Sequence, residues 1–271
     1  MRNIKSTISH CSDSSRVYLM DLHHDDFPKI ISIIENMADE NGYTKLFAKI
    51  PATYGPAFLN AGYVMEALIP GFYNGSEDAL FMMKYKTEER AKPESEALEA
   101  FQQLLLKPAN TKEIPMDADY TLKPLKEADA TNMVPVFKEV FETYPFPIYD
   151  PDYLIKTMKE DDTRYFGAFF NNELIAISSA ECNNTKKNAE MTDFAVISSH
   201  RGKRLAVHLL KFMEEELVKD GFKTFYTIAR LHSLPMNKTF YNLGYKYSGT
   251  LHNNTQISGK IESMNIWYKS R

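Results

Sequence analysis

The sequence has few cysteines. Among its 271 residues only Cys11 and Cys182 are cysteine. A disulfide framework or a structural zinc site needs several cysteines at short spacing, so the sequence predicts neither, and we expect no metal. Cys182 ends a predicted strand, where a bystander thiol is favoured over a catalytic nucleophile.

Long apolar runs and excess positive charge are missing as well. No run approaches the roughly 18 to 20 apolar residues of a membrane-spanning helix, and residues 1–16 contain no hydrophobic signal core. We therefore expect a cytoplasmic protein without a membrane partner. The formal net charge is −4 and the isoelectric point is near 6.0. A general nucleic-acid binder needs a broad basic surface, so no nucleic-acid partner is expected.

Apolar residues are plentiful enough for two domains. They make up 44% of the chain, which suffices for two modest cores. We predict a mixed domain over 1–90, a linker with a bridging helix over 91–118, and a second domain over 119–271. Clustered charge together with Pro93, Pro108 and Pro115 marks the linker.

Hydrophobic periodicity predicts alternating strands and helices. In the first domain we expect strands at 17–22, 44–50, 63–69 and 79–85, with helices at 25–41 and 51–61. In the second we expect strands at 122–125, 164–170, 174–181, 189–196, 224–229, 245–250 and 262–269, with helices at 129–141, 153–159, 205–217 and 235–242. This order predicts an α/β (α+β) fold: a mixed, mostly antiparallel sheet flanked by helices.

Residues 201–206, RGKRLA, join a strand to a long helix. A helix N-terminus offers unpaired N–H groups and a positive dipole end, which together attract a phosphate. Three cationic side chains add charge, and a glycine lets the backbone approach the anion. The predicted cofactor-binding residues of this turn are Arg201, Gly202, Lys203, Arg204, Leu205 and Ala206.

The turn resembles the acyl-CoA pyrophosphate loop of the GNAT N-acetyltransferases, Arg/Gln-x-x-Gly-x-Gly/Ala. Arg201 and Ala206 match its first and last positions, whereas Arg204 stands at the middle glycine and Gly202 is offset. A second segment, NKTFYNLGY over 237–245, resembles the N…FYxxLGF/Y motif of the same family. Together the two segments imply a GNAT fold over 120–271 and acetyl-CoA as co-substrate.

Further roles are implied by this resemblance. Backbone groups of Phe194, Ala195 and Val196 would bind the pantetheine arm and polarise the acetyl carbonyl. Tyr241 would protonate the departing thiolate; a core aromatic residue is the alternative interpretation. Asn237 would bind the pantetheine or cap its own helix.

Acetyl transfer also needs a base, because a lysine-like ammonium has a pKa near 10.4 and must lose a proton. Glu190 and Asp193 are the catalytic candidates on the strand 189–196. Since they are three residues apart, regular alternation places them on opposite faces, so only one can face the thioester. We prefer Asp193, which adjoins the carbonyl-binding segment. Either residue could instead be an ordinary carboxylate facing water.

An aromatic, proline-stiffened loop over 143–152, TYPFPIYDPD, is the predicted wall of the acceptor site. Tyr144, Phe146 and Tyr149 would surround an alkyl chain, while Asp150 and Asp152 would attract ammonium groups. A surface loop without a ligand is the alternative.

The two halves of the chain contain similar segments. FLNAGY over 58–63 and FYNLGY over 240–245 are offset by 244 − 62 = 182. We therefore predict that the first domain is a second, half-GNAT unit. It has DDFP over 25–28 where a phosphate loop would lie, and Leu59 where the other copy has Tyr241. Because acidic residues repel a pyrophosphate, we expect this copy to be non-catalytic.

Over its whole length the sequence resembles the β-lysine N6-acetyltransferases. The resemblance implies acetyl transfer to the side-chain amine of β-lysine, a small-molecule substrate, which gives N6-acetyl-β-lysine, a compatible solute. Another diamine or a protein lysine is the alternative acceptor, and a non-catalytic acyl-CoA sensor is the alternative class. A homodimer is one option for the assembly.

Overall fold

The computed structural model describes residues 4–113, 115–144, 146–257 and 259–271. Contacts between residues divide the chain into two compact units. The first unit contains residues 1–107, 229–234 and 247–267, and the second contains 108–228, 235–246 and 268–271. Because the units interleave along the chain, the limits predicted at residues 90 and 118 for functional domains stay a prediction.

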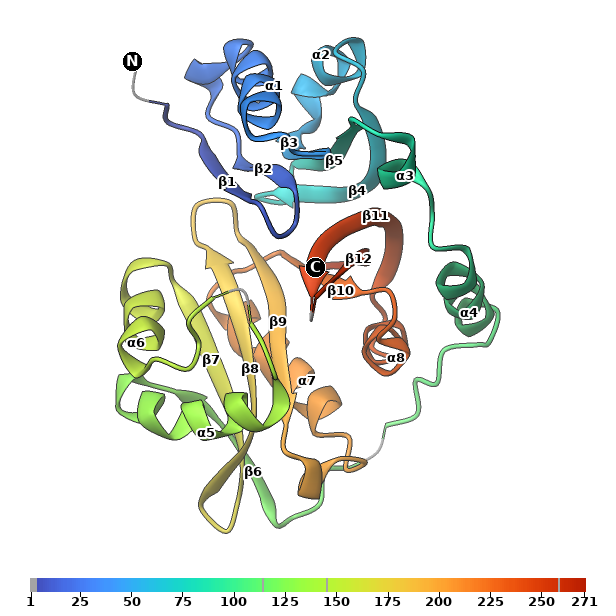
Figure 1. Cartoon of the computed structure of the whole chain (residues 1–271). Coiled ribbons are helices and arrows are strands. Elements are labelled where there is room, and N and C mark those ends of the chain that lie inside the picture. The colour runs from blue at the N-terminus through green and yellow to red at the C-terminus, as the bar shows by residue number, and fades with distance from the viewer. Residues whose placement is uncertain (1–3, 114, 145, 258) are drawn as a thin grey trace. The chain divides into compact units, whose positions relative to one another are not determined.

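The first part of the chain forms a five-stranded sheet of order β1-β2-β3-β5-β4 with helices packed on it (Figure 1). Its elements are β1 (Thr7–Cys11), β2 (Arg16–Asp21), η1 (His24–Asp26), α1 (Lys29–Asn41), β3 (Lys45–Pro51), η2 (Ala52–Tyr54), α2 (Gly55–Asn60), β4 (Val64–Tyr73), β5 (Glu77–Tyr85), α3 (Glu88–Ala91) and α4 (Ser95–Leu105).

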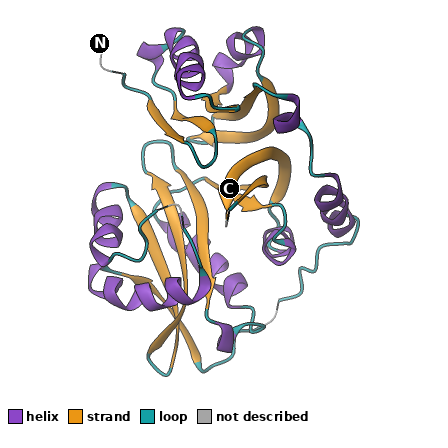
Figure 2. Ribbon diagram, in the orientation of Figure 1, coloured by secondary structure: helices purple, strands orange, loops and turns teal. Residues whose placement is uncertain are grey.

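The rest of the chain contributes a seven-stranded sheet of order β11-β12-β10-β9-β8-β7-β6, and helices alternate with its strands (Figure 2). The elements are β6 (Tyr120–Leu125), η3 (Glu127–Asp129), α5 (Ala130–Val140), α6 (Pro151–Glu160), β7 (Thr163–Phe170), β8 (Glu173–Asn183), β9 (Asn188–Val196), η4 (Ser198–His200), α7 (Leu205–Lys219), β10 (Thr224–Arg230), α8 (Leu234–Asn242), β11 (Lys246–Ile257) and β12 (Lys260–Ser270). The mixed α/β fold predicted from the sequence is confirmed. None of the helices in the described ranges is long and apolar enough to cross a membrane.

Several boundaries differ from the sequence prediction. The strand β1 and the short helix α3 were not predicted, and the helix expected from residue 25 begins at Lys29 because a separate 3-10 turn precedes it. The irregular loop ends at Asp150, since Pro151 is the first residue of α6, a position that proline tolerates well.

Helices cover both faces of the strands that carry the site. Ser178 of β8 donates its hydroxyl to the sulfur of Met213 on α7, at 2.8 Å. The preceding residue, Ile177, packs instead in the apolar cluster formed with α5 and α6. Because successive side chains of a strand point to opposite faces, β8 is buried on both sides.

The two sheets repeat one topology. The order β2-α1-β3-α2-β4-β5 matches β9-α7-β10-α8-β11-β12, and the strands hold the same places within their sheets. In each copy the first two strands are parallel. The resemblance seen between the FLNAGY and FYNLGY segments therefore extends to the connection of the chain.

Each copy also contains the same side-chain cluster. In the first, Lys84 of β5 lies 2.7 Å from Glu35 of α1, donates to the carbonyl oxygen of Ala61 at 2.7 Å, and lies 5.6 Å from the ring centre of Tyr63. The lysine thus joins the closing strand, the long helix and the glycine–tyrosine turn.

In the second copy the lysine is Lys269 of β12. It lies 2.6 Å from Glu214 of α7, donates to the carbonyl oxygen of Leu243 at 2.9 Å, and lies 5.5 Å from the ring centre of Tyr245. The cluster is therefore a shared feature of how both copies pack.

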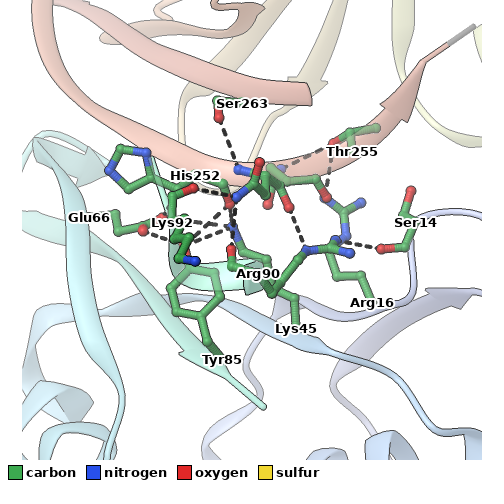
Figure 3. Close-up of polar contacts among 12 residues, drawn as sticks. Ser14, Arg16, Lys45, Glu66, Tyr85, Arg90, Lys92, His252, Thr255 and Ser263 are labelled. Atoms are coloured by element: carbon green, nitrogen blue, oxygen red, sulfur yellow. Dashed lines mark hydrogen bonds and ion pairs between the residues drawn. The ribbon is translucent and has the colours of Figure 1, made fainter. Parts of the chain in front are cut away.

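Three cations of the first unit bind one short stretch of β11 (Figure 3); Lys45 and Arg90 are buried, and Arg16 is half-buried. They donate to the carbonyl oxygens of three consecutive residues: Lys45 to His252 at 2.5 Å, Arg90 to Asn253 at 2.8 Å and Arg16 to Asn254 at 3.0 Å. Glu66 lies 3.8 Å from the Lys45 ammonium and accepts a hydrogen bond from Tyr85. Carbonyl dipoles and one carboxylate thus compensate the buried positive charge.

Candidate active site

The turn before α7 has the backbone of an anion-binding site. Gly202 has φ +79°, in the left-handed region that favours glycine, and Arg204 has φ +59°. Arg204 begins the helix, and in the described structure no side chain caps that end. The N–H of Val207 donates to the carbonyl oxygen of Arg204 at 2.9 Å. The N–H groups before it, those of Leu205 and Ala206, belong to the positions of a helix that have no acceptor inside the helix and can bind an anion.

Arg204 explains the partial match of the turn to its motif. The position where the motif has its middle glycine does adopt the left-handed conformation. A non-glycine residue pays about 1 kcal/mol or more for this backbone conformation. Arg204 thus has a backbone conformation that suits glycine, although its residue type departs from the motif. Its exposed guanidinium adds a positive charge at the helix N-terminus.

Side chains fix the turn to its neighbours. Arg201 donates from Nε to the carbonyl oxygen of Val196 at 3.3 Å. Glu139 of α5 accepts from the backbone N–H of Ser198 at 2.7 Å and from its hydroxyl at 2.8 Å, and these bonds lower the pKa of Glu139. The backbone of the turn is thus held in place while Lys203 stays exposed.

A surface pocket of about 500 Å³ opens beside this turn. One wall is formed by Arg204, His208 and Lys211 of α7, and Gly244 borders it after α8. Burial lowers the pKa of His208, and the charges of Lys211 and Arg204 act in the same direction. Lys211 pairs with Glu113, another lining residue, at 2.8 Å, so the pocket carries charges of both signs next to the N-terminus of the helix.

Strand β9 is interrupted by a β-bulge. Its parallel pairing with β10 covers residues 188–190. Farther along, Thr192 pairs with Ser179 and Ala195 pairs with Ile177, so two residues of β9 lie opposite the single residue Ser178. The first of the two, Asp193, has φ +55°. Bulges re-aim side chains and expose backbone groups, and this one occurs inside the predicted carbonyl-binding segment.

The bulge overturns the expected placement of the two candidate bases. Directly opposite residues of an antiparallel pair project to the same face. Glu190 pairs with Glu181, which is two residues from Ser179, so Glu190 projects to the face of Ser179. The carboxylate of Asp193 binds the hydroxyl of Ser179 at 2.6 Å and lies on that face as well. The prediction of opposite faces is therefore wrong, because the bulge inserts one extra residue into the alternation.

Three hydroxyl groups donate to the Asp193 carboxylate. Tyr144 donates to Oδ1, Ser179 donates to Oδ2 at 2.6 Å, and Thr192 donates to Oδ1 at 3.4 Å. Burial raises the pKa of Asp193, and the bonds from Ser179, Tyr144 and Thr192 oppose that rise. Burial and the nearby Asp193 charge raise the pKa of Tyr144 well above its ordinary value, so the tyrosine is the donor of the pair.

The loop before α6 contributes Tyr144 to this site. The ring centre of Tyr144 lies 5.1 Å from that of Phe141 and 6.5 Å from that of Phe146, which is 55% exposed. Tyr149 donates its hydroxyl to the carbonyl oxygen of Phe141 at 2.6 Å. The loop therefore has an aromatic row that ends at the Asp193 carboxylate.

The two loop carboxylates have a different position. Asp150 caps α6, and its side chain accepts from the N–H of Asp152 at 3.0 Å. Asp152 is exposed in the first helical turn, where an acidic residue complements the helix dipole. Tyr144 thus contacts the candidate base Asp193, whereas the carboxylate of Asp150 is used to cap a helix.

Helix α8 lies against the bulge. The ring of Phe240 meets that of Phe194 edge to face, with centres 5.8 Å apart. Asn237 is fully buried, and Tyr241 is half-buried beside Phe240 in the sequence. The contact brings the predicted tyrosine helix next to the predicted carbonyl-binding strand.

Ser179 and Glu181 were missed from the sequence. Both lie on β8 opposite the β9 site residues, Ser179 across from Thr192 and Glu181 across from Glu190. The charges of Asp193, Glu181 and Glu190 all raise the pKa of Tyr144, and of the three carboxylates Asp193 accepts its hydrogen bond. The register of the predicted hairpin could have identified Glu181.

One group in the described residues has ligand atoms close enough to hold a metal ion. It consists of His23, His24 and Asp25, whose ligand atoms lie within 4.8 Å of one another. Asp25 already pairs with the ammonium of Lys5 at 2.5 Å. These residues lie in the segment of the first copy that takes the place of the phosphate turn.

Comparisons with known proteins agree with this geometry. Residues 131–245 match the acetyltransferase (GNAT) family. The chain is 37% identical, over 98% of its length and 97% of the relative, to a β-lysine N6-acetyltransferase of Methanococcus maripaludis. It is 30% identical, over 92% of its length and 94% of the relative, to the N-acetyltransferase YodP of Bacillus subtilis. A solved spermidine/spermine N-acetyltransferase of Vibrio cholerae shares the fold with a TM-score of 0.50 and 17% identity, over 57% of this chain and 95% of that chain.

Proposed function

Because the chain belongs to the GNAT acetyltransferase family, we propose that it transfers the acetyl group of acetyl-CoA to the side-chain amine of β-lysine. The product is then N6-acetyl-β-lysine. The full-length likeness to a β-lysine N6-acetyltransferase is the observation that carries this choice of substrate. Protein lysines and other diamines remain the competing acceptors for the assay below.

Acetyl-CoA fits the residues around α7. Its pyrophosphate is bound by the uncapped N-terminus of α7 and by the residues of the turn, 201–206. The adjoining pocket beside Arg204 receives the nucleotide end. The backbone groups of Phe194, Ala195 and Val196 bind the pantetheine arm, because β9 continues past its described pairing with β10. Asn237, buried in α8, supports this arm.

The acceptor amine binds on the face of β9 that carries Asp193 and Glu190. Together with Glu181 these carboxylates form a negative site for an ammonium group. The aromatic row that ends at Tyr144 provides apolar surface for the alkyl chain, extended by Phe146 and Tyr149. Asp150 and Asp152 add negative charge at the far end of the loop, where they attract a second ammonium group.

Asp193 takes the proton of the acceptor ammonium. The free amine nitrogen then attacks the thioester carbonyl carbon, a new C–N bond forms, and the C–S bond breaks. Backbone N–H groups at the bulge stabilise the negative charge that develops on the carbonyl oxygen. Tyr241 gives its proton to the departing thiolate. The nitrogen loses its second proton as the intermediate collapses, and this proton restores the Tyr241 hydroxyl through solvent, so the proton taken by Asp193 is the one released overall.

The first copy plays no part in this chemistry. It has the segment His23–Pro28 where the second copy has its cationic turn, and Leu59 where the second copy has Tyr241. We assign it a packing role in the first unit, and we place the enzyme in the cytoplasm. The homodimer remains a prediction.

A thiol-release assay tests the proposal. The purified protein is given acetyl-CoA with β-lysine, α-lysine, spermidine, 1,5-diaminopentane or a lysine-containing peptide, and free CoA is measured with a thiol reagent. We expect the highest kcat/KM with β-lysine and an acetyl group on N6 by mass spectrometry. A higher kcat/KM with another amine would refute the substrate, and tight acetyl-CoA binding without thiol release for any amine would indicate a sensor.

A further inference from the structure

The hydroxyl of Tyr144 is the one contact described between the 141–150 loop and the carboxylate of Asp193. This loop was expected to be a passive wall of the acceptor site. The hydrogen bond gives one of its residues a direct effect on the group that takes the proton.

Both ends of the loop are fixed. At its start, Phe141 packs on Phe137 with ring centres 6.1 Å apart. At its end, Ile148 is 3% exposed within the apolar cluster, and Tyr149 donates to the Phe141 carbonyl oxygen at 2.6 Å. Because these contacts determine the path of the loop, the Tyr144 hydroxyl is presented to β9 in one place.

The carboxylate is held on both oxygens. Tyr144 binds Oδ1 and Ser179 binds Oδ2, while the backbone of Asp193 is in the left-handed region at φ +55°. A non-glycine residue pays a steric cost for this backbone conformation, and it persists only where the surrounding structure holds it. The hydroxyl groups of Tyr144, from the loop, and Ser179, from β8, hold the side chain of Asp193 in place.

We propose that Tyr144 fastens the loop to Asp193, and that Tyr144 and Ser179 are positioning residues for the carboxylate that accepts the proton from the substrate amine. This inference rests on the proposed function, in which Asp193 is the base. It extends that function by coupling the acceptor loop to the proton-transfer step.

Hydroxyl donors stabilise the ionised carboxylate, whereas burial disfavours it. The other titratable groups that face this position are Glu181 of β8, Glu190 of β9, Tyr153 of α6 and Tyr165 of β7. Removing one hydroxyl donor therefore raises the pKa of Asp193, by about one unit for a hydrogen bond to a charged group.

The test is the pH dependence of kcat/KM, whose acid limb reports the base of the free enzyme. We expect this limb to move upward by about one pH unit in Tyr144→Phe and in Ser179→Ala. Ser178→Ala is the matched control for the serine, because Ser178 faces Met213 on the opposite side of β8. Tyr120→Phe is the control for the tyrosine, because the hydroxyl of Tyr120 contacts Nδ1 of His200 at 2.9 Å.

A limb that stays in place in both Tyr144→Phe and Ser179→Ala would overturn the proposal, as would an equal shift in the two controls. Acetyl-CoA affinity by calorimetry shows whether each variant is folded. Should a variant be inactive, ¹³C NMR titration of the aspartate carboxyl groups in the full-length protein reads the pKa of Asp193 directly, with Asp193→Asn to assign the signal. An unshifted signal is then the refuting result.

This outcome is separable from failure of the proposed function. If β-lysine is not the acceptor, the wild-type protein acetylates another amine of the panel with higher kcat/KM. The acid limb of the pH profile can then be measured with that amine. If no amine is acetylated, the NMR titration still decides the contact between Tyr144 and Asp193.

Discussion

Replacing Gly249 by alanine is a sharp test of how β11 is held in the first unit. A β-carbon built on Gly249 would lie 1.9 Å from the carbonyl oxygen of Glu66 and 3.2 Å from Cα of Ala67. Both contacts are to the backbone of β4, which cannot rotate away. Beside them, the hydroxyl of Ser248 accepts from the N–H of Leu68 at 2.8 Å and donates to its carbonyl oxygen at 2.6 Å.

The expected loss of stability follows from these contacts. A methyl group at Gly249 forces β4 and β11 apart by about 1 Å, and such overpacking costs about 1 to 3 kcal/mol. The same displacement breaks the two hydrogen bonds of Ser248, each contributing about 1 kcal/mol. Gly249 is outside the left-handed region, so no backbone penalty is added. We therefore expect Gly249→Ala to lower the free energy of unfolding by about 3 to 5 kcal/mol.

Urea denaturation measures this loss. The single tryptophan, Trp267, is fully buried in the same unit, so its fluorescence reports unfolding there. Gly42→Ala is the matched control: Gly42 has φ +66° and no atom within 4 Å of its virtual β-carbon, so only a backbone cost of about 1 kcal/mol is expected. A loss for Gly249→Ala no larger than that of the control would refute the close approach of β4 and β11.

Three further predictions concern the catalytic and electrostatic features. The double variant Arg201→Ala/Lys203→Ala should raise the KM for acetyl-CoA about tenfold or more, since two cations near the phosphates are lost; an unchanged KM would exclude the phosphate role. Tyr241→Phe should lower kcat by about 10²-fold with nearly unchanged CoA affinity, because only the proton donor is removed; equal losses in both quantities would reject that role. Burial lowers the pKa of Lys45 to about 7, so between that pH and the pKa of an unfolded lysine the unfolded chain binds more protons. Stability should therefore rise with pH there, by up to about 1.4 kcal/mol per unit, and urea titrations of Lys45→Met should lack this slope.

Sequence patterns predicted those elements that are long and periodic. The helix from Leu205 and the strands around it were confirmed, because apolar residues at regular spacing fix which face is buried. The predicted strands 164–170 and 174–181 were confirmed too, and Asn171 and Asn172 between them have positive φ, which asparagine adopts more readily than most residues. The short strand β1 was missed because its residues are mostly exposed and show no apolar alternation.

The arrangement of the site was harder to predict. A bulge does not appear in the alternation of a strand, since any aspartate can in principle take the extended or the left-handed conformation. For this reason the faces of Glu190 and Asp193 were assigned wrongly. The contact of Tyr144 with Asp193 joins residues 49 positions apart, and no local pattern contains it. The cap at Asp150 is different: an aspartate followed by proline is a usual helix start, so that signal was present and was interpreted as a ligand.

The repeat separates residues that serve the fold from residues that serve catalysis. The lysine, glutamate and tyrosine of the packing cluster occur in both copies, as Lys84 with Glu35 and as Lys269 with Glu214. In both copies the cluster joins the closing strand to the long helix. Its presence in both indicates a role in packing that does not depend on catalysis. Leu59 and Tyr241, in contrast, hold the same place in two helices of one topology. Since the first copy folds with leucine there, the fold does not require a hydroxyl at that position. We therefore expect the hydroxyl of Tyr241 to serve the activity of the second copy, and Tyr241→Phe tests this.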